Sequence, residues 1–308
     1  MEILRCGELN WINIEKPTQK EISFLAQNYH FHSLALDDCI SKVQLPKIDK
    51  YENYLFIVLH FPNFSSEGRI IPSQLSIFLG KNYVITISSG DLKPLSEAFQ
   101  VCKNDEKALL AVLRSPGYLL YHIIDRLVDS LFPLLDKIIN ELDDIEDKVF
   151  DEKIEAVREV TMLRRRIARF RRIIYPLKRV IGELAKETSH YTADDLPIYF
   201  GDVEDHVDKV WATLDECKEI IEIYKDTDFM LSTEKTNKIL AILTIFFTLS
   251  IPITVIGTVY GMNIPLPGGI ETQPWTFLGP YTTFIVLLIL STVPALLMLW
   301  YFRHSGWL

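Results

Sequence analysis

The chain has 308 residues, a formal net charge of −9 at pH 7 and a hydrophobic content of 48%. The acidic balance disfavours nucleic acid as a partner and is compatible with cation binding. The four cysteines are scattered with no CxxC pair, which disfavours a zinc cluster or a disulfide framework and fits a reducing cytosolic compartment. Glu271 is the only formally charged residue between Lys238 and Arg303, so we interpret the bulk of the chain as soluble and the last quarter as membrane.

Residues 1–115 mix strand-like and helix-like runs and predict a cytoplasmic α/β layer. The continuous apolar run Tyr54–Phe61 predicts a strand that is covered on both faces of a sheet. A hairpin is expected around a Gly80–Asn82 turn. The hairpin strands and the helices expected in this layer are Leu75–Leu79, Tyr83–Ile87, Thr18–Tyr29 and Leu92–Cys102.

From Ser115-Pro116 the pattern turns helical, and residues 116–194 predict a long antiparallel helical hairpin. Its first helix should continue to about Phe150 and its second should cover about Lys153–Lys186. The second half of the first helix is acidic and the second helix is basic, so the pair would bring opposite charges together. The simple interpretation is a solvated hairpin with ion pairs across it. The functional alternative is that the acidic helix concentrates cations near a pore mouth.

Residues 195–260 predict a stalk helix that starts at Asp195 and Pro197 and continues into a first membrane span at 239–260. This uncharged span would reach about 33 Å, enough to cross the hydrocarbon core. Residues 282–302 predict a second span, joined to the first by an extracytoplasmic loop at 261–281 and followed by a tail at 303–308. The alternative for both apolar runs is a pair of buried core helices. Apolar residues at heptad spacing mark the soluble part of the stalk: Val203, Val207, Val210, Leu214, Cys217, Ile221 and Tyr224.

The flanking charges predict the orientation of the spans in the cell membrane. Lys235 and Lys238 precede the first span and Arg303 follows the second, whereas the loop carries only Glu271. Lys and Arg favour the cytoplasmic side, so both termini are expected inside and the loop outside.

One face of the first span predicts a pore wall. Residues at a spacing of three or four are polar at the cytoplasmic end, apolar in the middle and hydroxylated towards the outside. An apolar middle can gate by dewetting, and polar ends can hold water and ions. The alternative for each threonine is a hydrogen bond to its own backbone. One helix cannot enclose a pore, so this interpretation requires an oligomer. The predicted pore-lining residues are Asn237, Leu240, Thr244, Phe247, Ile251, Thr254 and Thr258.

Gly261, Met262 and Asn263 close the first span on the outer side and form the predicted selectivity filter. Repeated around a ring, Asn263 would present a crown of amide oxygens. Mg²⁺ gives up its water reluctantly, so neutral oxygens could hold the hydrated ion weakly enough for conduction.

The sequence YGMN at Tyr260–Asn263, between two C-terminal apolar helices, resembles the CorA family of magnesium transporters. The stretches at 45–59, 171–184, 199–210 and 235–240, and Pro252 and Thr254 in the first span, extend the resemblance over nearly the whole chain. It implies an α+β membrane protein that assembles with itself as a homopentameric funnel in the lipid bilayer. It also implies a channel for Mg²⁺ uptake that intracellular Mg²⁺ closes at subunit interfaces. The tripeptide GMN, in place of GVN or GIN, favours magnesium over zinc, cobalt or nickel as the transported ion.

Asp202 matches the metal-sensing aspartate that the family has between subunits. Asp91, in SSGDLKP, is the candidate partner carboxylate from a neighbouring α/β layer. The plain alternative for Asp202 is an acid favoured by the helix dipole. Two departures stand out: the loop lacks acids close to Asn263, which leaves open whether Glu271 attracts ions, and the terminus RHSGWL is less basic than is usual in the family.

Other functions stay open at this stage. The nearest is a Zn²⁺, Co²⁺ or Ni²⁺ transporter of the same superfamily, related to ZntB, and a different class is a membrane-anchored metal sensor that conducts nothing. An enzyme is least expected, because the seven histidines form no metal or nucleophile pattern. His206 lies one helical turn from Asp202, and the expectation for it is packing.

Overall fold

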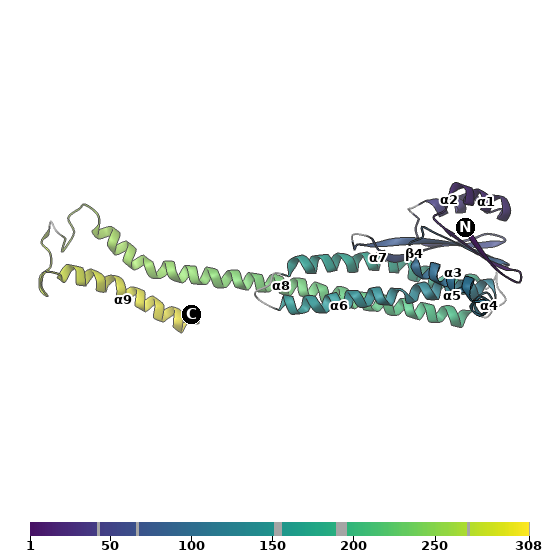
Figure 1. Ribbon diagram of the computed structural model, residues 1–308. Coiled ribbons are helices and arrows are strands. Elements are labelled where there is room, and N and C mark those ends of the chain that lie inside the picture. The colour runs from purple at the N-terminus through teal and green to yellow at the C-terminus, as the bar shows by residue number, and fades with distance from the viewer. Residues whose placement is uncertain (42–43, 66–67, 151–155, 189–195, 270–271, 308) are drawn as a thin grey trace. The chain divides into compact units, whose positions relative to one another are not determined.

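The computed structural model (Figure 1) describes residues 1–41, 44–65, 68–150, 156–188, 196–269 and 272–307. The chain divides into two compact units, Met1–Asp228 and Phe229–Leu308. The predicted start signal at Asp195, the first residues of the predicted helix at Lys153 and the loop acid Glu271 lie outside the described residues.

The first unit begins with a six-stranded sheet of order β1-β2-β6-β5-β4-β3. β2 and β6 pair in parallel, and the other neighbouring strands pair antiparallel. The predicted hairpin is confirmed, with Gly80 paired to Tyr83 at its turn. The strands are β1 (Glu2–Cys6), β2 (Leu9–Glu15), β3 (Lys47–Lys50), β4 (Tyr54–Phe64), β5 (Ile70–Gly80) and β6 (Tyr83–Ser88).

Helices cover both faces of this sheet, as its continuous apolar strands require. Alternate strand residues divide between two cores, one beneath α1 (Gln19–Tyr29) and α2 (Ser33–Ile40), the other beneath α3 (Lys93–Asn104), α4 (Glu106–Val112) and α5 (Pro116–Asp129) (Figure 1). Phe56 and Phe78 lie in the first core, and Leu55 and Leu79 lie in the second. The expected helices at Thr18–Tyr29 and Leu92–Cys102 are confirmed within two residues at each end.

The single helix expected from residue 116 to about Phe150 is wrong, because it is two helices, α5 and α6 (Leu131–Val149), that meet at Ser130. Pro133 lies in the first turn of α6, where a residue without a backbone N–H is tolerated. The same proline inside one continuous helix would lack the bond to the carbonyl of Asp129.

The acidic and basic helices do form ion pairs, but α7 (Val157–Thr188) pairs on two sides. Towards α6, Arg166 pairs with Glu141 and Lys148 with Glu159. Towards α8 (Pro197–Tyr260), Arg171 pairs with Asp215 at 2.6 Å, among others. The heptad residues predicted for the stalk are all buried, so α8 packs its apolar stripe into the same core as α6 and α7.

The second unit holds the last part of α8, an outer loop and α9 (Thr282–His304). Both helices are long and apolar enough to cross a membrane, with best-window mean hydropathies of 2.5 and 2.3, and the chain itself leaves most of these windows exposed. The alternative of two buried core helices is therefore wrong. Ile245 of α8 and Ser291 of α9 are exceptions, with exposed fractions of 6% and 9%.

Phe170 tests the shared core of the first unit. Its side chain is fully buried on α7, so Phe170→Ala should lower the free energy of unfolding of this unit by about 3–5 kcal/mol. Phe150→Ala is the matched control, because Phe150 is 59% exposed. Denaturant unfolding followed by circular dichroism measures both variants, and equal losses would contradict the packing described.

Candidate functional site

The predicted pore-lining residues share one face of α8, and that face is uncovered. Asn237, Leu240, Thr244, Phe247, Ile251, Thr254 and Thr258 are all exposed in the single chain. Most of the less exposed residues recur at helical spacing on another side of α8, about 130° around the helix from this face. The less exposed residues between Ala241 and Tyr260 are Ala241, Ile245, Thr248, Leu249, Ser250, Pro252, Ile256 and Tyr260. The chain therefore partly covers one side of the helix and leaves the predicted pore face exposed, together with other apolar residues such as Ile242 and Phe246.

Threonine hydroxyls on this segment donate to the helix backbone and can still accept a hydrogen bond from water. Thr254 donates its hydroxyl proton to the carbonyl of Ser250 at 2.9 Å, and Thr248 donates to the carbonyl of Thr244 at 2.7 Å. These are the backbone bonds expected of threonine in a membrane helix. The oxygen lone pairs of Thr254 stay available as acceptors, so a threonine bonded in this way can still contact water on an exposed face.

The predicted filter residues follow the last turn of α8 without a left-handed residue. Gly261 donates its backbone N–H to the carbonyl of Gly257 at 2.9 Å, and Met262 donates to the carbonyl of Val259 at 3.2 Å. A Cβ on Gly261 would lie 3.1 Å from the oxygen of Gly257, so close backbone approach favours glycine here. Asn263 is exposed, which leaves its amide free to face other copies.

The outer loop folds back on the second span. Trp275 lies over Gly268, where a Cβ would be only 2.8 Å from the indole ring, and Gly268 has a φ of +74°. The backbone N–H of Trp275 donates to the hydroxyl of Thr283 at 3.0 Å, and the phenol of Tyr260 donates to the carbonyl of Pro267 at 3.2 Å. These contacts fix the described part of the loop next to the filter residues.

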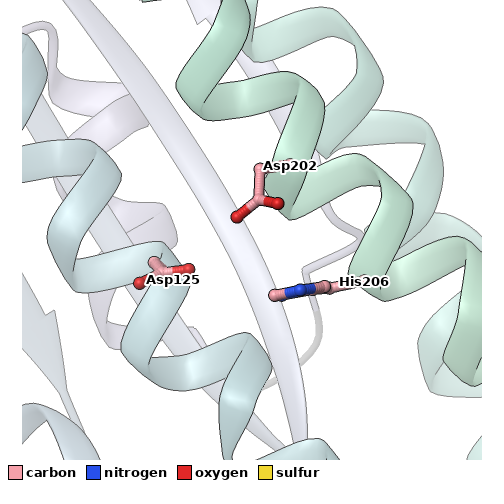
Figure 2. Close-up of side chains that lie close together, drawn as sticks. All are labelled: Asp125, Asp202 and His206. Carbon is pink, nitrogen blue, oxygen red and sulfur yellow. The ribbon is translucent and has the colours of Figure 1, made fainter.

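A second group of side chains lies between α5 and α8 in the first unit. Figure 2 shows Asp202 and His206 one turn apart on α8, facing Asp125 on α5. One ligand atom from each residue lies within 4.8 Å of the other two. A fourth residue, Asp129, lies one turn after Asp125, and its carboxylate is 3.7 Å from Nδ1 of His206.

Burial and like charge act together in this group. The pKa of Asp125 is raised, first by burial and then by the neighbouring carboxylates of Asp129 and Asp202. The phenol of Tyr121 responds in the same way, since burial and the two aspartates Asp125 and Asp202 raise its pKa to about 12. Nδ1 of His206 is buried without a hydrogen-bond partner among the described residues. Such a group favours a bound cation, because the cation would offset the carboxylate repulsion.

The donor set fits a divalent ion. Carboxylate oxygens suit Mg²⁺ and Mn²⁺, and an imidazole nitrogen adds affinity for Co²⁺, Ni²⁺ and Zn²⁺. His206, which the sequence analysis assigned to packing, also packs edge-on against Phe132 with ring centroids 5.7 Å apart. Its ring thus has an apolar neighbour on one side and carboxylates on another.

Asp91 lies elsewhere in the first unit. Its carboxylate accepts hydrogen bonds from the hydroxyls of Ser73 and Ser89, the latter at 2.7 Å. Its backbone carbonyl accepts from the amide of Asn63 at 2.7 Å. These bonds fix the loop between β6 and α3, and Asp91 is not in the group formed by Asp125, Asp202 and His206. Its pairing with Asp202 of another copy stays a prediction.

Comparisons with known proteins identify the family of the chain. The family described as CorA-like Mg²⁺ transporter protein matches residues 7–304. The chain belongs to this family. It is 29% identical over 306 residues to the cobalt/magnesium transport protein CorA of Thermotoga maritima, an alignment that covers 97% of this chain and 83% of that one.

The chain is also similar to more distant proteins. The zinc transport protein ZntB of Yersinia enterocolitica is 20% identical, with 97% of this chain and 88% of that one covered. The solved structure of the CorA magnesium transporter from Methanocaldococcus jannaschii shares the fold, with a TM-score of 0.81 and 23% identity, over 98% of this chain and 92% of that one.

Sequence reasoning missed Asp125 in this CorA-like chain. The signal available was an acid at an inward position of an amphipathic helix, followed one turn later by Asp129. Burying a carboxylate is costly unless a partner compensates its charge, but the sequence does not identify the helix that supplies this partner. Asp202 and His206 share a face of α8 by their spacing of four, and only the packing of α5 against α8 brings Asp125 beside them as a third candidate ligand.

His206 gives the group a testable metal preference. At equal free concentration, Co²⁺ should raise the melting temperature of the purified protein more than Mg²⁺, because only Co²⁺ gains from the imidazole. The stabilisation reaches about 2.7 kcal/mol when the ion is at about 100 times its Kd. His206→Ala should remove the excess given by Co²⁺, while His122→Ala, outside the group, should keep it. An unchanged Co²⁺ shift in His206→Ala would exclude the imidazole as a ligand.

Proposed function

We propose that this chain forms a homopentameric channel in the cell membrane and conducts Mg²⁺ into the cytoplasm. The observation that carries the proposal is the uncovered face of α8, whose residues run from Asn237 to Thr258 and end beside Asn263. Copies of this face around an axis would enclose a path with polar ends and an apolar middle. The subunit number comes from the resemblance to the CorA family.

The middle of the path would act as the gate. Leu240, Phe247 and Ile251 are exposed apolar side chains on the predicted pore face. A ring of such residues narrows the path and excludes water when the copies approach. An ion then has no room for its hydration shell, and losing that shell would cost a large free energy. A small separation of the helices would rehydrate the path.

The outer mouth would select the ion through its water. Mg²⁺ keeps most of its shell because dehydration is costly. Asn263 offers neutral oxygen and nitrogen atoms to that shell, whereas a ring of carboxylates would hold the ion too tightly for flow. A membrane potential of about 100 mV contributes roughly 2.3 kcal/mol per charge, and nearly twice that for Mg²⁺, so inward flux needs no further energy source.

Intracellular Mg²⁺ would close the channel by binding at Asp202. Asp125 and His206 stand ready as ligands within the same chain, and Asp91 of a neighbouring copy is the proposed further partner. A cation bound between copies holds them together, and its loss leaves like charges facing each other. The ion acts as a gate only through its higher affinity for the closed arrangement.

A second candidate is a channel that prefers Co²⁺, Ni²⁺ or Zn²⁺. The imidazole of His206 in the metal group favours it, and the ZntB relative carries zinc by its name. Against it, the outer mouth offers amide groups and no histidine or cysteine among its described residues. Competition uptake with each ion separates the two candidates.

Asn263→Ala tests the selectivity ring. Removing the amide leaves the hydrated ion without a partner at the mouth, so Mg²⁺ uptake into liposomes should fall by about 100-fold or more, which corresponds to roughly 2.7 kcal/mol. Ile264→Ala, one residue further along the exposed loop, should keep most of the flux. Normal Mg²⁺ flux in Asn263→Ala would refute the ring, and no flux in the wild type would favour a non-conducting sensor.

Asp202→Ala tests the gate separately from the pore. The variant should conduct Mg²⁺ but need a higher internal Mg²⁺ concentration for closure, by about tenfold for a loss of roughly 1.4 kcal/mol. Current recording from patches with controlled internal Mg²⁺ gives the midpoint. Asp205→Ala, on the same helix but outside the metal group, is the control. An unchanged midpoint in Asp202→Ala would remove this carboxylate from the gate.

A further inference from the structure

An ordered ladder of ion pairs joins α7 to α8. Arg164 pairs with Glu222, Arg171 with Asp215 at 2.6 Å, and Lys178 with Asp208 at 2.8 Å. From one pair to the next, the position moves seven residues forward along α7 and seven residues back along α8. This regular step shows that the two helices run antiparallel in one continuous register, so the residues that face each other between the ion pairs follow from it.

The ladder has a gap between its first two pairs. By the register, the α7 residue opposite Lys218 is Ala168, whose methyl group cannot pair with an ammonium. Both residues line a pocket of about 380 Å³. The buried side chains of Ile167 and Ile221 form its apolar floor. A small residue in place of an acid therefore leaves both a groove and an unpaired cation.

The lining of the groove is strongly positive. Arg164, Arg165, Arg171 and Lys218 face it, with Glu222 as the one carboxylate among the described lining residues. Arg165 and Lys218 are exposed and have no ion pair in the part of the chain that the structure describes. In a chain of net charge −9, such a cluster repels cations and attracts anions. The charge of the groove thus suits an anion better than a divalent cation.

An aromatic pair follows the groove along the same register. Tyr175 packs against Trp211 with ring centroids 5.6 Å apart, and the guanidinium of Arg171 lies 4.8 Å from the Trp211 ring. Tyr175 is 67% exposed, so its ring has a face available for stacking. Seven residues separate Tyr175 from Ala168, or about 10.5 Å along the helix. Positive charge and an exposed aromatic ring are therefore spaced as the phosphates and the base of a nucleotide are.

We propose that this groove binds a nucleoside triphosphate in its metal-free form, without hydrolysing it. The phosphates would lie at Arg165 and Lys218, where a guanidinium can bind two oxygens and an ammonium acts as a point charge. The base would stack on Tyr175. Bound Mg²⁺ neutralises phosphate charge, so the metal-free nucleotide binds more tightly. The inference holds whether or not the chain conducts magnesium.

Two substitutions test the groove from opposite sides. Lys218→Glu reverses the unpaired charge. Ala168→Glu supplies the missing acid opposite Lys218, completes the ladder and fills the gap. Calorimetric titration of the full-length protein in detergent with ATP and a chelator should show binding to the wild type and about a tenfold or greater loss in both variants. Ala168→Glu should also raise the melting temperature, which separates lost binding from lost folding.

Lys20→Glu is the matched control, because Lys20 is an exposed lysine of α1 without an ion pair among the described residues, and it should bind ATP as the wild type does. Excess Mg²⁺ should weaken binding, and tripolyphosphate should bind more weakly than ATP. The proposal is overturned if the wild type shows no binding of millimolar ATP, or if Lys218→Glu and Ala168→Glu bind unchanged. Equal affinity for tripolyphosphate would overturn the nucleoside assignment.

Discussion

The constraint on which the rest depends is that one membrane helix cannot cover its own polar face, even where a hydroxyl such as that of Thr254 donates to its own backbone. The chain covers Ile245 and its neighbours on one side of α8, and leaves Thr244, Thr254 and Thr258 on the other. Hydrocarbon is a poor environment for asparagine and for an open row of hydroxyls. That face therefore needs other helices, water or both. The proposed ring of copies would provide all of these at once, and it would bring the exposed Asn263 amides together.

A second constraint arises from like charge in the soluble unit. Burial is the main cause of the raised pKa of Asp125; the carboxylates of Asp129 and Asp202 raise it further, while His206 and Arg126 lower it. A divalent ion removes this repulsion, so the group is most stable when a cation is present. The free energy of such a site varies with cation concentration, which is the property that a feedback gate requires. In the proposed function, the gate would bind the ion firmly through carboxylates, whereas the pore would hold it weakly through amides.

The sequence predicted the elements better than their partners. Apolar continuity identified the strand at Tyr54, and heptad spacing identified the buried residues of α8, because burial imposes a period that one sequence displays. The break at Ser130 was also available from Pro133. The proximity of Asp125 to His206 could not be predicted from the sequence, since it depends on how α5 packs against α8. The same holds for the basic helix: its charge was evident, but its division between α6 and α8 requires the packing.

Helical geometry explains why one set of α8 carboxylates is neutralised and another is not. The ladder uses Asp208, Asp215 and Glu222, which share one face of α8 because seven residues are nearly two turns. Asp202 comes six residues before Asp208, about 120° around the helix, and therefore points towards α5 rather than α7. Among the described residues, no arginine or lysine of α7 forms an ion pair with Asp202. A sequence rich in both charges can thus keep a carboxylate group free for a cation, because the spacing along α8 assigns each acid to a different neighbour.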